Sequence, residues 1–69
     1  MKIYYRDTVT GKTHWTNPKS HSVQKVNWLG REVIAIIAYR KNDELIIPAW
    51  CVAPESRHLL TEAKEVNVH

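Results

Sequence analysis

The side chains with the clearest chemical potential are the basic and aromatic residues that alternate through the first half of the chain. Lysine and arginine neutralise phosphates and aromatic rings stack on bases, so this combination is typical of proteins that bind single-stranded nucleic acid. A solvated sheet face that keeps a protein soluble would show a similar composition. The candidate binding residues are Tyr4, Arg6, Lys12, His14, Trp15, Lys19, Lys25, Trp28 and Arg31.

The charge of the chain is divided unequally between its halves. The formal net charge is +3, from 10 Lys and Arg against 7 Asp and Glu. Residues 1–31 carry +5 and residues 32–69 carry −2, so the basic excess belongs wholly to the first half. The partners that this distribution predicts are nucleic acid or an acidic protein surface.

No set of residues resembles a catalytic or metal centre. The four histidines show no i, i+4 pairing, and a metal site needs three or four converging ligands. Cys51 lies at the end of an apolar run and is expected to be a buried, inert thiol. With two glycines, the chain offers no phosphate-cradling loop. We therefore expect no enzyme activity, no cofactor and no metal.

Length and composition predict one small globular domain over residues 1–69. Apolar residues make up 43% and charged residues 25%, which are ordinary globular values. A single cysteine excludes an internal disulfide. The longest apolar run, residues 33–39, is far shorter than the ~20 residues that span a bilayer, and Arg6 interrupts the start of the chain. We expect a cytoplasmic protein with no membrane partner.

Residues 2–16 are predicted to form a β-hairpin. Two segments rich in aromatic and β-branched residues, 2–6 and 12–16, flank a turn that ends at Gly11. The period of two places Ile3 and Tyr5 on one face and Tyr4 and Arg6 on the other. The hairpin should end near Pro18, which cannot donate to a ladder.

Residues 23–50 are predicted to form a three-stranded meander, and residues 55–66 a helix. Residues 33–39 are apolar on both parities, which suits a central strand covered on both faces. Pro48 in the last strand predicts an edge strand or a bulge. Leu59, Leu60, Ala63 and Val66 fall on one helical face, with Ser56 as a candidate N-cap. This helix could also form a homodimer.

The fold class that follows is mainly β, or α+β. Five short antiparallel strands and one C-terminal helix are most simply arranged as a meander that curls into a small SH3-like barrel. A twisted sheet with the helix packed on one face is the alternative.

The first hairpin resembles the second half of a WW domain. The resemblance covers 15 of 69 residues and rests on Tyr4-Tyr5-x-Asp7-x-x-Thr10-x-x-Thr13-x-Trp15-x-x-Pro18. It implies binding of proline-rich peptides in a groove lined by Tyr4, Thr13 and Trp15. It also implies that Tyr5 and Pro18 are core residues. The sequence departs from the family because only three residues precede Tyr4, where the family has its first strand, and because Thr8 replaces the family's histidine.

The function that these features favour is a small non-catalytic regulatory binding module. Its first predicted ligand is nucleic acid, bound through the basic aromatic N-terminal face. The alternative is a protein-binding inhibitor or adaptor, by analogy with phage- or plasmid-type proteins that cover a surface of a larger enzyme. Its candidate hot spots are Tyr4, Trp15, Trp28 and Arg31. A WW-like peptide binder is a third possibility.

Overall fold

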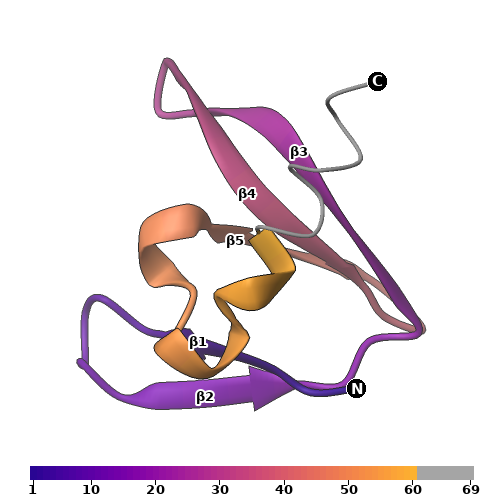
Figure 1. The fold of residues 1–69 in the computed structure, drawn as a ribbon. Helices are drawn as coiled ribbons and strands as arrows, with labels where there is room; N and C mark the ends of the chain where they lie inside the picture. Colours follow the sequence, from indigo (N-terminus) through magenta and orange to yellow (C-terminus); the bar gives the residue numbers. More distant parts are fainter. Residues whose placement is uncertain (61–69) are drawn as a thin grey trace.

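The chain forms five antiparallel strands in two separate sheets, as the computed structural model shows for residues 1–60 (Figure 1). The first sheet is a hairpin of β1 (Ile3–Arg6) and β2 (Thr13–Thr16). The second is a meander in the order β3 (Ser20–Trp28), β4 (Arg31–Tyr39) and β5 (Glu44–Pro48). The prediction of a mainly β protein with five antiparallel strands is confirmed.

The strands do not form the continuous meander or the SH3-like barrel expected from the sequence, because neither sheet closes. The break falls between β2 and β3, where Asn17, Pro18 and Lys19 lie outside both ladders. Pro18 supplies no backbone donor for a ladder at this point. The edges that a barrel would join therefore remain separate.

The central strand of the larger sheet is β4, and its apolar residues 35–38 are covered on both faces, while Ile34 is exposed. Ile36 and Ala38 point to one face, while Ala35 and Ile37 point to the other, and all four are buried. The apolar residues on both parities of residues 33–39 predicted a central strand that is buried on both faces. β5 is an edge strand that ends at Pro48, and the chain then turns into the 3₁₀ segment η1 (Ala49–Cys51).

The two sheets share one hydrophobic core. Its buried side chains come from β1, β4, β5 and the segment that follows β5, and they are Ile3, Ile36, Ala38, Ile47, Val52 and Leu59. In Figure 1 the helical segment after β5 lies between the first hairpin and the three-stranded sheet. This segment is therefore the layer that joins the sheets.

The C-terminal helix differs at its start from the expectation. Residues Pro54–Ser56 form a second 3₁₀ turn, η2, and helical backbone follows only at residues 58–60. Ser56 caps no helix, because its hydroxyl accepts a hydrogen bond from the backbone N–H of Tyr4 at 2.8 Å. The remainder of the predicted helix, with Ala63 and Val66 of its apolar face, lies outside the described residues. None of the described helical segments is long and apolar enough to cross a membrane.

Candidate functional site

The first hairpin has a buried face and an outer face. Ile3 and Thr16 are paired and buried, and Tyr5 packs against the core, so this face looks inward. The opposite face carries Tyr4, Arg6, Thr13 and Trp15, with Lys2 just before the strand. We call these five residues the hairpin face. The strand parity expected from the sequence is confirmed.

Trp15 is the centre of the hairpin face. It lies directly across the ladder from Tyr4, and its side chain is 54% exposed. The Lys2 ammonium lies 4.3 Å from the centroid of the Trp15 ring, a cation–π contact. Arg6 is exposed at the end of β1. The face therefore combines two aromatic rings with two cations.

The far edge of β1 fixes the hairpin in place. The N–H of Ala53 donates to the carbonyl of Tyr4 at 2.9 Å, and Tyr5 forms an isolated bridge with Val52. The Ser56 hydroxyl oxygen accepts a hydrogen bond from the N–H of Tyr4. β1 is therefore held along both edges, by β2 on one side and by residues 52–56 on the other.

Three other candidate residues near the first hairpin do not join this face. His14 alternates to the opposite face, where its ring lies 5.8 Å from that of Tyr5. Lys12 is exposed in the loop, and its carbonyl accepts the N–H of Asp7. Lys19 precedes β3, and its N–H donates to the carbonyl of Tyr39.

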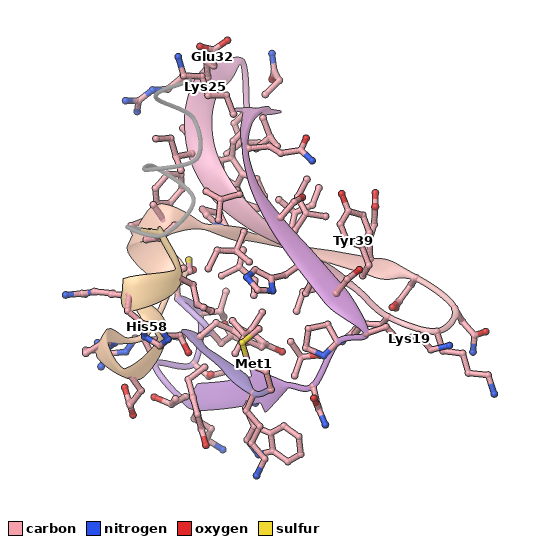
Figure 2. All side chains as sticks on the ribbon, turned by 45° about the vertical axis from the view of Figure 1, so that its right-hand side comes forward. Met1, Lys19, Lys25, Glu32, Tyr39 and His58 are labelled. Atoms are coloured by element: carbon pink, nitrogen blue, oxygen red, sulfur yellow. The ribbon has the colours of Figure 1, made fainter. Side chains whose placement is uncertain are left out.

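The remaining candidates lie on the second sheet, far along the β3–β4 hairpin. Figure 2 shows Lys25 at the opposite end of this hairpin from Lys19, and well away from Met1. Lys25 contacts Glu32 at 3.9 Å, with both side chains largely exposed. Trp28 and Arg31 flank the turn. The candidate residues are thus divided between two surfaces.

The turn of the β3–β4 hairpin carries an apolar surface that the sequence analysis did not single out. Leu29 is 91% exposed and has a positive φ of 52°, while Gly30 follows with φ of 81°. Trp50, 55% exposed, meets Trp28 edge to face at 6.2 Å. Two consecutive positive φ values define a type I′ turn, which normally takes Asn or Gly. Leu29 is the signal in the sequence that could have pointed to this surface.

The remaining groups with chemical potential are isolated. Cys51 is half-buried rather than buried, and desolvation raises the pKa of its thiol. Among residues 1–60, no three His, Cys, Asp or Glu side chains converge as metal ligands. The exposed Arg40 guanidinium binds both oxygens of Asp43 at 2.7 Å and lowers the pKa of that carboxyl. This pair closes the turn between β4 and β5 and touches neither candidate surface.

No family model, curated protein or solved structure matches this chain. The hairpin face and the β3–β4 turn both carry exposed aromatic or apolar side chains beside basic residues.

Proposed function

We propose that this protein is a small non-catalytic binding module that takes single-stranded nucleic acid on the hairpin face. The observation that supports the proposal is the exposed indole of Trp15, paired with Tyr4 and in contact with the Lys2 ammonium. Exposed aromatic rings flanked by cations suit stacking on bases together with phosphate neutralisation. A protein that regulates by covering a nucleic-acid site needs no catalytic group.

The dimensions of the hairpin face favour a short single strand over a duplex. Each strand of the hairpin has four residues, which at ~3.3 Å per residue gives a face about 13 Å long. Two or three unstacked nucleotides cover that length. A base that stacks on Trp15 moves the Lys2 ammonium off the ring, toward the adjoining phosphate. Arg6 supplies the second phosphate contact.

The stacking step is tested by fluorescence anisotropy with labelled ten-nucleotide DNA and RNA at low salt. We expect Trp15→Ala to weaken binding roughly 5- to 150-fold, the loss of one base–aromatic stack. The matched control is Trp50→Ala, since Trp50 is equally exposed but lies in the 3₁₀ segment after β5, away from the hairpin face. Equal losses from the two variants, or no binding by the wild-type protein, would contradict the proposal.

The phosphate contacts are tested by the salt dependence of the same binding. Lys2→Ala and Arg6→Ala should each reduce the slope of log K against log salt by about 0.7, the value for one phosphate on a single strand. Lys25→Ala is the control, because Lys25 lies far from the hairpin face and beside Glu32. A slope that falls as much for Lys25→Ala would place the nucleic acid elsewhere.

A second candidate function, binding of a protein partner at the β3–β4 turn, is favoured by Leu29. A fully exposed leucine in a backbone conformation that disfavours it costs stability, which points to selection for an apolar contact. Trp28, Trp50 and Arg31 beside it are residue types that dominate protein interfaces. The basic Arg31 fits an acidic rim on the partner.

This candidate is tested by comparing two exposed apolar residues on different hairpins. Leu29→Asn keeps the turn and removes the apolar side chain, while Val9→Asn does the same on the first hairpin, where Val9 is also 91% exposed. A stoichiometric partner captured by the wild type should be retained by Val9→Asn and lost by Leu29→Asn. Retention of the partner by both variants would exclude the turn as its site.

A further inference from the structure

The longest strand edge in the described structure has no neighbour. β3 contributes nine residues, and it is the terminal strand of its sheet. Figure 2 shows β3 running along one side of the sheet, from near Lys19 toward Lys25. An open edge presents unpaired N–H and C=O groups that can template another strand. Residues 1–60 supply no strand to pair with this edge.

Alternate residues of β3 direct their backbone groups to the open edge. Trp28 and Arg31 flank a two-residue turn and so form a hydrogen-bonded pair. Because hydrogen-bonded and non-hydrogen-bonded pairs alternate, the backbone N–H and C=O groups of Val26, Gln24 and Ser22 also bond to β4. The backbone groups that face outward belong to His21, Val23, Lys25 and Asn27.

β3 has few of the sequence features that normally prevent another strand from pairing with an open edge. The strand contains no proline and no glycine, and its pairing with β4 continues without a bulge from Ser20 to Trp28. Lys25 is its only Lys, Arg, Asp or Glu residue, and Glu32 lies 3.9 Å from the Lys25 ammonium. An edge of this length and low charge is suited to strand pairing.

We propose that the partner of this edge is β3 of a second copy, in an antiparallel homodimer with Gln24 opposite Gln24 on the two-fold axis. Gln24 is the middle residue of Ser20–Trp28, so this register overlaps the whole strand. All outward residues then pair with one another, His21 with Asn27 and Val23 with Lys25. The result is about eight hydrogen bonds between copies and a continuous six-stranded sheet.

Charge selects this register over its neighbours. A shift that centres the axis on Lys25 places two ammonium groups opposite each other, which is unfavourable. A shift in the other direction, which centres the axis on Val23, places Asn27 opposite Lys19 and leaves the outward groups of Asn27 without a partner strand. In the Gln24 register Lys25 faces Val23, and like charges never oppose. The Gln24 register therefore combines full overlap of the two strands with the absence of like-charge pairs.

The dimer is tested by sedimentation of the full chain over roughly 10 μM to 1 mM, where weak interfaces dissociate. We expect the mass to rise from 8.1 kDa toward twice that value. Over the same range, hydrogen exchange at the Val23 and Lys25 amides should slow, while the Gln24 amide, already bonded to β4, should not change. A monomer throughout would overturn the proposal.

The register is tested with opposite charges at residue 24. Gln24→Glu and Gln24→Lys should each remain monomeric, because each places like charges on the axis, and an equimolar mixture should form a heterodimer. Dimerisation of Gln24→Glu alone at wild-type strength, or a mixture that stays monomeric, would overturn this register. Circular dichroism confirms that both variants are folded.

A backbone variant separates edge pairing from side-chain effects. Lys25→Pro removes one outward N–H that the ladder with β4 does not use, and the Lys25 side chain is exposed, so folding should survive. Lys25→Ala retains the N–H and is the control. We expect Lys25→Ala to dimerise at least as well as the wild type and folded Lys25→Pro to be monomeric. Equal dimerisation of the two would exclude β3 as the interface.

Discussion

The Ser56 hydroxyl joins two segments that are far apart in the sequence. Ser56 is 1% exposed, and its oxygen accepts the N–H of Tyr4, 52 residues away. This bond and the neighbouring one from Ala53 satisfy the edge of β1 that would otherwise be open. From the sequence, Ser56 was expected to cap a helix. In the structure its hydroxyl oxygen instead accepts a hydrogen bond from the edge of β1.

Replacing Ser56 with alanine should destabilise the protein by about 1–3 kcal/mol, because the part-buried N–H of Tyr4 loses its partner. Urea denaturation followed by circular dichroism measures the change. Ser20→Ala is the control, since Ser20 is exposed at the start of β3, and it should change stability by less than about 0.5 kcal/mol. Equal effects would show that the bond is unimportant.

Sequence reasoning at single residues succeeded where alternation decides the outcome. Ile3 and Tyr5 share the inner face of β1, and Tyr4 and Arg6 share the outer face, as a period of two requires. The position of Trp50 could not be predicted in this way, because Trp50 lies in a 3₁₀ turn after β5, where side chains do not alternate between two faces. The contact between Trp50 and Trp28 arises from folding of the chain back on itself and leaves no local signature.

At the scale of elements, the β3–β4 hairpin contains a turn that departs from the usual sequence. Gly30 suits its position, and its N–H is held by the Asn27 side chain at 3.1 Å. Leu29 occupies the other left-handed position, which a side chain with a Cβ disfavours by about 1–2 kcal/mol.

Leu29→Asn should therefore stabilise the protein by about 0.5–1 kcal/mol, since asparagine tolerates the left-handed conformation. Thermal unfolding of the variant and the wild type gives the difference. Val9→Asn, a change of similar chemistry on the first hairpin, should have little effect. A destabilised Leu29→Asn would mean that the leucine makes contacts that outweigh its backbone strain.

The β4–β5 turn is closed by the bidentate pair of Arg40 and Asp43. The hydrogen bonds from Arg40 lower the pKa of Asp43 in the folded state, so the stabilisation is complete above the ordinary aspartate pKa. It is lost as the pH falls through the lowered value. Carboxyl NMR titration should show a depressed pKa for Asp43 in the wild type and a return toward the ordinary value in Arg40→Gln.

The strands were predictable from composition and period, but their grouping into two sheets was not. Apolar residues on both parities identified β4 as a central strand, and Pro48 identified β5 as an edge. Closure of a barrel depends on pairing between strands distant in the sequence, which local patterns do not encode. The backbone partner of β1 comes from residues 52–56, which the sequence assigned to a loop and a helix start.

At the scale of the whole molecule, the two sheets depend on one core and should unfold together. Ile3 belongs to the first hairpin and Ile36 to the meander, yet both are fully buried in the same cluster. An isolated two-stranded hairpin is at best marginally stable in water. The first hairpin therefore owes its stability to the second sheet and the segment between them.

Ile3→Ala should cost about 2–5 kcal/mol and lower the unfolding midpoint of both sheets equally. NMR signals from Trp15 and from Trp28 report on the two sheets separately. Coincident transitions are expected in the wild type and the variant. A variant in which the Trp15 signal is lost first would show that the first hairpin unfolds independently.

The contacts of residues 52–56 with β1 also bear on the order in which the chain folds. The backbone partners of Tyr4 lie about fifty residues further along the chain. Contacts of such high sequence separation slow folding, because the connecting chain must lose its freedom first. The meander β3–β5 has only local turns and can form earlier. We therefore expect the three-stranded sheet to form before residues 52–56 close on β1.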